Sequence, residues 1–163
     1  MFSHIMIGAN DMDASKSFYD ATLGALGIPP GRADEKGRVF YMTKTGVFGI
    51  TKPINGEQAC AANGGTIGFA ADSPELADAW HAAGLANGGT TCEDPPGIRE
   101  GKMGTLYIAY LRDPAGNKIC ALKRMAEIGA EPIGDTPDQM AKQIRDETEK
   151  FAKLVKQANV TLD

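Results

Sequence analysis

The order of apolar and polar positions along the first 123 residues predicts two copies of one strand-and-helix pattern. Residues 2–9, FSHIMIGA, form an apolar run that predicts a largely buried strand, and residues 11–27 follow as a helix. Residues 64–71, GGTIGFAA, and residues 73–89, SPELADAWHAAGLANGG, repeat that order. Both predicted helices end in glycines, which favour a helix C-terminus. The chain therefore begins its two halves in the same way.

The starts of the two predicted helices carry capping signals. Asp11 or Asp13 is the expected N-cap of the first helix. Ser73 is the expected N-cap of the second, with Pro74 at the first helical position.

A shift of 62 residues superimposes the two halves. It aligns Phe18 with Trp80, and we interpret these as equivalent core anchors of the two helices. Identical residues fall together at Ile5 and Ile67, Ala9 and Ala71, Ala21 and Ala83, Leu23 and Leu85, and Gly27 and Gly89. An internal duplication explains these matches economically, and shared helix and strand composition also contributes to them.

Further strand-like segments follow each predicted helix. They are residues 38–44 and 46–53 in the first half, and residues 89–93, 104–113 and 117–123 in the second. Turns are expected at Thr45-Gly46 and at the sequence DPAGN, residues 113–117. Each half thus predicts a βαββ(β) order, and a third strand of the first half would fall near residues 27–37. The fold class is α+β, with modules 1–57 and 63–123.

The remainder, residues 124–163, follows a different pattern. Thr136 and Gln139 form a capping box around Pro137. Apolar residues then recur at helical spacing, at Met140, Ile144, Phe151, Leu154, Val155 and Ala158. They predict a long C-terminal amphipathic helix of about 20 residues and about 30 Å. Its apolar stripe would cover its own domain or a partner subunit.

Composition restricts the function classes. With 163 residues, 42% of them hydrophobic and 23% charged, the chain fits one soluble globular domain. The net charge of −4 gives nucleic-acid binding no electrostatic support. No apolar run approaches the roughly 20 residues of a membrane helix. Cys60, Cys92 and Cys120 are odd in number and lack CxxC spacing, and no signal sequence is recognised, so a cytoplasmic location is expected.

Residues 2–123 resemble the vicinal oxygen chelate superfamily, which includes glyoxalase I, bleomycin-resistance proteins, fosfomycin-resistance enzymes and extradiol dioxygenases. The resemblance rests on the two halves, on the opening HIMIGANDMDASKSFYDATLGALG and on the closing YLRDPAGNKICAL. It implies paired βαβββ modules whose curved mixed sheet forms a cleft. It also implies a divalent metal in that cleft, held by side chains on the first strand of each half and on the last strand.

The resemblance places His4 at the first ligand position, where a neutral imidazole would bind zinc, nickel or iron. The equivalent position of the second half is Thr66, whose hydroxyl is a poor ligand. On the last strand Cys120 takes the place of the family's glutamate, and a thiolate can bind zinc. His4 and Cys120 are thus the candidate metal ligands and catalytic residues, and two protein ligands would bind a metal weakly. The alternative is that His4 is half buried at the strand start and hydrogen-bonded to a neighbour, and that Cys120 packs as a small apolar residue.

Other residues are candidates for ligand binding. Tyr107, Tyr110 and Phe48 lie on predicted strands, although alternation alone does not say which face lines a cavity. Arg99 lies in a Pro- and Gly-rich loop, residues 91–104, which would close over an anionic or carbonyl-bearing ligand or would be a solvated surface loop.

Residues 127–163 resemble the C-terminal segment of the periplasmic receptors of tripartite tricarboxylate transporters, through GAEP, G-x-TP and a long helix. This resemblance transfers no solute pocket, because the receptors bind solute through loops elsewhere in their chains. We interpret the tail as an extra helix that seals a sheet face or adds to a dimer interface.

A homodimer is expected, because paired domains cover sheet edges and cleft walls, and each cleft would be built by the two halves of one chain or by halves from two chains. Three functional hypotheses remain open. In the first, the protein binds a small organic molecule in the cleft and acts as a lyase or isomerase, in the manner of lactoylglutathione lyase, with a degraded metal site. In the second, it is a non-catalytic module that binds or sequesters its ligand. A third option is an interaction protein whose tail helix docks on another chain.

Overall fold

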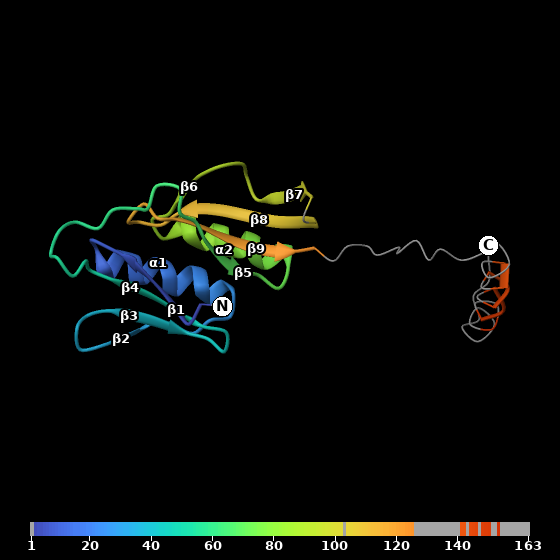
Figure 1. Ribbon diagram of the computed structural model, residues 1–163, viewed down its shortest axis with the longest axis horizontal. Helices are drawn as coiled ribbons and strands as arrows, with labels where there is room; N and C mark the ends of the chain where they lie inside the picture. Colours follow the sequence, from blue (N-terminus) through green and yellow to red (C-terminus); the bar gives the residue numbers. More distant parts are fainter. Residues whose placement is uncertain are drawn as a thin grey trace. The chain divides into compact units, whose positions relative to one another are not determined.

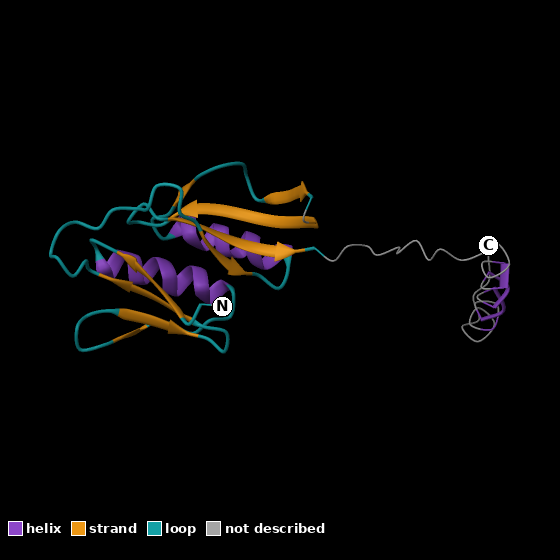
Figure 2. Ribbon diagram, in the orientation of Figure 1, coloured by secondary structure: helices purple, strands orange, loops and turns teal. Residues whose placement is uncertain are grey.

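The computed structural model of the chain divides into two compact units, residues 1–127 and 128–163. Figures 1 and 2 show the elements of the larger unit. The described residues are 2–102, 104–125, 141–142, 144–146, 148–150 and 153. No helix among them is both long enough and apolar enough to cross a membrane.

The larger unit contains the two predicted copies. The elements of the first are β1 (His4–Gly8), α1 (Met12–Ala25), β2 (Arg32–Ala33), β3 (Val39–Met42) and β4 (Val47–Thr51). Those of the second are β5 (Ile67–Ala70), α2 (Pro74–Ala86), β6 (Thr90–Thr91), β7 (Gly97–Gly101), β8 (Gly104–Arg112) and β9 (Lys118–Arg124).

Each copy builds its own mixed sheet. The first sheet has the order β1-β4-β3-β2, and only β1 and β4 run parallel. The second has the order β5-β9-β8-β6, with β5 and β9 parallel, and β7 also pairs with β8. The strands of both sheets are curved in the ribbon (Figure 2). The predicted α+β class with curved mixed sheets is therefore confirmed.

One strand differs from the sequence prediction. The sequence predicts a loop over residues 91–104, but its residues 97–101 form β7 and pair with residues 104–108 of β8. β6 pairs with the other end of β8, at Arg112 and Leu111. The outer strand of this sheet is thus split in two, with Pro95 and Pro96 between its parts. Proline removes a backbone donor, so the ladder is interrupted there.

The two copies share their local geometry. Asp11 and Ser73, 62 residues apart, are the N-caps of α1 and α2. Each side chain accepts a hydrogen bond from the backbone N–H three residues on, at 2.9 and 3.3 Å. Phe18 and Trp80, also 62 residues apart, are both completely buried. The helix starts and their core anchors are therefore equivalent in the structure as well as in the sequence.

The core joins the two copies. α1 and α2 lie side by side and pack against each other (Figure 1). The ring of Tyr19 lies 4.8 Å from that of Phe48 on β4, and Phe48 lies 5.2 Å from Phe69 on β5. At Gly84 of α2 an added Cβ would approach Leu111 to 2.3 Å. An alanine at this contact between α2 and the second sheet would therefore force the buried Leu111 side chain to shift.

The DPAGN turn ties the second copy to the first. Asp113 is only 4% exposed, and its carboxylate accepts a hydrogen bond from the Tyr19 hydroxyl at 2.8 Å. It also accepts hydrogen bonds from the backbone N–H groups of Ala115 and Asn117 and from the Asn117 side-chain amide. That amide donates a further bond to the Gly8 carbonyl at 3.2 Å. Burial and the Asp113 carboxylate both raise the pKa of Tyr19 well above its ordinary value.

The described residues of the tail are helical, and Thr148 Oγ1 donates to the Ile144 carbonyl at 2.6 Å. The capping box and most of the apolar stripe, from Met140 to Ala158, lie outside the described residues. A continuous helix of the predicted length is therefore not supported.

Candidate functional site

Strand register separates two faces of the first sheet. Tyr41 and Phe48 share a row with Ile5, and both are buried in the core beneath the helices. The next row contains His4, Val47 and Met42. Because successive side chains of a strand point to opposite faces, this row lies on the face turned away from α1. We call it the open face of the first sheet.

His4 is the first residue of β1, an edge strand, and it is exposed. Its Nδ1 atom lies 2.9 Å from the Ser3 hydroxyl oxygen. A hydroxyl can donate or accept, so Ser3 is compatible with either tautomer of the neutral ring. The predicted hydrogen bond of His4 to a neighbour is thus present. The half burial predicted with it is wrong, because His4 begins an edge strand and is exposed.

A pocket of about 530 Å³ opens beside His4, which we call the first pocket. Its wall is mostly apolar and comes from both copies. Leu23 and Leu26 line it from the end of α1, Phe48 from β4, and Phe69 from β5. Polar groups are contributed by the turn between β3 and β4, at Thr43, Thr45 and Gly46. A concave apolar wall with a few polar groups is typical of small-molecule sites.

Cys120 lies in the second sheet, in one row with Gly68 and Tyr110. It is 4% exposed, and burial raises the pKa of its thiol to about 11. Without a bound metal the thiol is therefore protonated at neutral pH, and a protonated thiol is a poor nucleophile. An added Cβ at Gly68 would lie 3.3 Å from the sulfur, so this glycine accommodates the thiol.

Tyr110 and Tyr107 are separated by the register. Tyr110 shares the face of Cys120, and the Lys118 ammonium lies 4.8 Å from its ring centroid. Burial is the largest of the effects that raise the pKa of Tyr110. Tyr107 lies three rows along β8 from Tyr110 and donates a hydrogen bond to Asp78 of α2 at 2.7 Å, so it faces the helix. The sequence reasoning treated both tyrosines as candidates for one cleft, and the structure places them on opposite faces.

Neither Arg99 nor Thr66 lines the first pocket. Arg99 lies on β7, and its guanidinium donates to the carbonyl oxygens of Pro95 and Ile98, at 2.8 and 3.1 Å. Its side chain is thus held by its own segment. Thr66 precedes β5 directly and is exposed. Of the residues predicted for the site, the first pocket brings together His4 and Phe48.

The side chains present do not fit a three-ligand divalent centre within one chain. Among residues 2–102, 104–125 and the described part of the tail, no group of three or more His, Cys, Asp or Glu side chains could hold a metal ion. His4 belongs to the first sheet, whereas Cys120 belongs to the second. A catalytic zinc site requires three protein ligands. We therefore derive no chemical step through a metal.

Sequence reasoning missed most of the pocket wall. Leu26 and Ile28 follow the last turn of α1, and Gly27 between them has a φ of 78°. Apolar residues directly after a helix-ending glycine would have been the available signal, because they continue neither the helix nor a strand. Ile67 was recognised as part of a strand, but its position at the pocket depends on the packing of the two copies.

Comparisons with known proteins agree with this architecture. The family model of the Glyoxalase/Bleomycin resistance protein/Dioxygenase superfamily matches residues 1–121. A glyoxalase/bleomycin resistance protein from Albidiferax ferrireducens T118 is 65% identical in sequence, with a TM-score of 0.74. The alignment covers 76% of this chain and 99% of that one. A search of curated proteins gives no match.

More distant structures share the fold alone. A glyoxalase-related enzyme from Fulvimarina pelagi is 18% identical, with a TM-score of 0.59 and coverage of 80% of this chain and 94% of that one. A glyoxalase/bleomycin resistance protein/dioxygenase family enzyme from Burkholderia phytofirmans PsJN is 19% identical, with a TM-score of 0.56 and coverage of 76% and 98%. With the family model spanning most of its length, this chain belongs to the glyoxalase/bleomycin resistance protein/dioxygenase superfamily.

Proposed function

We propose that the protein binds a small, largely apolar organic molecule in the first pocket, with a polar group of the ligand at His4. The observation that carries this proposal is the pocket itself. Its volume of about 530 Å³ falls within the range of about 300–1,000 Å³ that is usual for small-molecule sites. Apolar side chains form most of the wall, and His4, on the edge strand of the first sheet, is among the lining residues.

The His4 and Ser3 pair explains what kind of polar group the site would accept. When the Ser3 hydroxyl donates to Nδ1, the proton of the neutral ring is on Nε2, which then donates to a ligand. When Nδ1 donates to Ser3, Nε2 accepts instead. A hydroxyl or a carbonyl group on the ligand suits one of the two arrangements. The resulting site selects for a small molecule with one such group on an apolar body.

A second candidate is lyase or isomerase chemistry, and the restrained imidazole favours it. His4 would transfer a proton to or from the ligand, since a histidine changes its charge near neutral pH more readily than other side chains. Cys120 would not act as the nucleophile in its protonated state. Apart from the adjacent Ser3 hydroxyl, no hydrogen bond links His4 to a described residue that would orient it as a general base, and binding without turnover is therefore the first choice.

We also propose that the protein is a homodimer. Phe2 and Met42 are 70% and 67% exposed, and Met42 shares the open face with His4. Exposed apolar side chains on a sheet face are typical of surfaces that a partner covers. Sedimentation equilibrium should give twice the mass of one chain, and a monomer at micromolar concentration would refute this assembly.

The binding proposal can be tested with 1-naphthol, a neutral aromatic probe with one hydroxyl group, by isothermal titration calorimetry. His4→Ala should weaken binding by about five- to tenfold, which corresponds to the loss of one hydrogen bond. His81→Ala is the matched control, because His81 is the other histidine and does not line the pocket. Equal effects of the two substitutions, or no binding by the unmodified protein, would contradict the proposal.

Elemental analysis tests the metal expectation separately. Protein purified without chelator should contain well below one zinc, nickel or iron per chain, because no group of three His, Cys, Asp or Glu side chains in the described part of the chain could hold the ion. A stoichiometric metal that disappears in His4→Ala would reinstate the metal-dependent alternative.

A further inference from the structure

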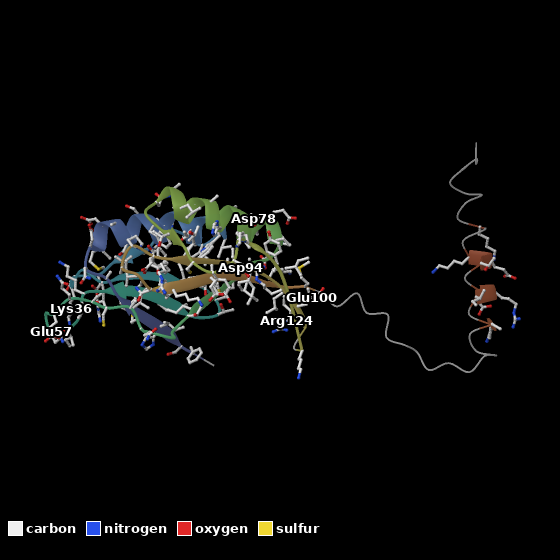
Figure 3. The ribbon with its side chains drawn as sticks, turned by 90° about the horizontal axis from the view of Figure 1, so that it is seen from above. Lys36, Glu57, Asp78, Asp94, Glu100 and Arg124 are labelled. Carbon is white, nitrogen blue, oxygen red and sulfur yellow. The ribbon has the colours of Figure 1, made fainter. Side chains whose placement is uncertain are left out.

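A second pocket, of about 930 Å³, lies in the first copy. The first turn of α1 borders it, together with residues 33–39, which connect β2 to β3, and residues 51–54, which follow β4. None of its lining residues lines the first pocket. Figure 3 shows Lys36, one of these residues, at the end of the unit away from Glu100 and Arg124. The second pocket is thus a separate cavity.

Cationic side chains dominate its polar lining. They are Lys16, Lys36, Arg38 and Lys52, against the single carboxylate of Asp13. The protein as a whole carries a net charge of −4, so this concentration of positive charge runs against its composition. Clefts lined by one sign of charge attract ligands of the opposite sign.

Two of the four cations already have partners. Lys16 pairs with Asp20 at 2.5 Å, four residues on along α1. Arg38 makes two hydrogen bonds to the Asp34 carboxylate, at 2.8 and 2.6 Å, and these lower the pKa of Asp34. Both cations are therefore partly neutralised and held in place.

Lys36 and Lys52 differ from them. Neither forms an ion pair or a side-chain hydrogen bond with any residue that the structure describes. Glu57, which lies toward the same end of the unit in Figure 3, accepts a hydrogen bond from Asn55 instead and does not line the pocket. Two uncompensated ammonium groups are consequently available to an anion.

The rest of the lining is apolar. Met6, Met12, Val39, Pro53 and Ile54 supply it. Ile54 follows Lys52 by two residues and is fully exposed to solvent. Covering such a side chain removes apolar surface from water and contributes about 25 cal/mol for each Å². Methionine side chains also adapt to varied ligand shapes.

We propose that the second pocket binds an organic carboxylate with an apolar body, its carboxylate near Lys36 and Lys52 and its apolar part against Ile54 and the two methionines. A lone inorganic anion would leave the apolar side chains uncovered, and a neutral apolar molecule would leave the two ammonium groups unpaired. A molecule with both an anionic group and an apolar body matches the lining. This site is independent of the proposed function, which concerns the first pocket.

Octanoate, 1-octanol and inorganic phosphate are suitable probes, followed by amide chemical shifts in the full chain. Octanoate should perturb the signals of Met12, Val39 and Ile54 at lower concentration than either other probe. Binding of 1-octanol or of phosphate as tightly as octanoate at these residues would overturn the proposal. So would octanoate shifts confined to Leu26 and Phe69 of the first pocket.

Charge-removing variants give a second readout. The double substitution Lys36→Gln and Lys52→Gln should weaken octanoate binding by about fivefold, the effect expected from two exposed charge pairs. Lys102→Gln with Lys142→Gln is the matched control, since both lysines are exposed and lie outside the pocket. If the two double variants weaken octanoate binding equally, the loss reflects the net charge of the protein alone, and the proposed carboxylate site is refuted. Binding of 1-naphthol should be unchanged in both, so the two proposals fail independently.

Discussion

The buried hydrogen bond between Tyr19 and Asp113 gives a stability prediction with a matched control. Tyr19→Phe removes the hydroxyl that donates to Asp113 at 2.8 Å, and no other atom of the buried ring. In this variant the Asp113 carboxylate still accepts hydrogen bonds from the backbone N–H groups of Ala115 and Asn117 and from the Asn117 side-chain amide. Tyr107→Phe is the control, because Tyr107 also donates to an aspartate, Asp78, but on the surface.

The magnitude follows from burial. A buried hydrogen bond to a charged group contributes about 1.5–3 kcal/mol, so Tyr19→Phe should lower the free energy of unfolding by about 2 kcal/mol. Tyr107→Phe should change it by less than about 0.5 kcal/mol, as surface substitutions usually do. Asp113→Ala should cost more than Tyr19→Phe, at least about 3 kcal/mol, because it leaves the Tyr19 hydroxyl and the turn donors without their acceptor.

Urea denaturation followed by circular dichroism measures all three variants. The slope of free energy against urea should be the same for each, which shows that only stability has changed. Equal losses for Tyr19→Phe and Tyr107→Phe would refute the argument, since burial would then not distinguish the two bonds. A loss for Asp113→Ala no larger than that for Tyr19→Phe would show that the turn does not depend on its carboxylate.

Three further outcomes are expected. The free energy of unfolding should fall as the pH rises above about 9, because the folded pKa values of Cys120 and Tyr19 lie above their unfolded values, so the unfolded chain releases these protons first. Urea titrations at pH 7 and pH 10 measure this fall. Gly84→Ala should destabilise by about 1–3 kcal/mol through its contact with Leu111, as the same denaturation assay would show. Iodoacetamide at pH 7.5 should alkylate the exposed Cys60 well before Cys120, as peptide mass spectrometry would show.

Each of these outcomes has a clear contrary result. Stability that rises between pH 8 and pH 10 would have the wrong sign for groups with raised pKa values. An alanine at position 84 without cost would mean that Leu111 moves aside freely. Equal alkylation rates of Cys60 and Cys120 would show that the second thiol is neither buried nor protonated as described.

The local elements were predictable because their signals are local. Ser73 and the glycines at the ends of both helices specify caps within a few residues, and the 62-residue shift exposes the repeat. β7 was not predictable in the same way. Its sequence, GIREG, has no apolar alternation, because the strand pairs on one side only, with β8, and is largely exposed.

The site was less predictable than the fold, for a geometric reason. Tyr107 and Tyr110 are three residues apart on one strand, so alternation already places them on opposite faces, but only packing shows which face the helix covers. His4 was correctly placed on the first strand. Its pocket depends on the end of α1 and on β5, which are brought to it by contacts between residues far apart in the sequence.

A structure of the full chain with 1-naphthol would show directly whether the first pocket binds a small apolar molecule with its polar group at His4. We expect the aromatic rings against Phe48 and Phe69 and the hydroxyl group within hydrogen-bonding distance of His4 Nε2. Naphthol bound elsewhere, with this cavity filled by rearranged side chains, would contradict it.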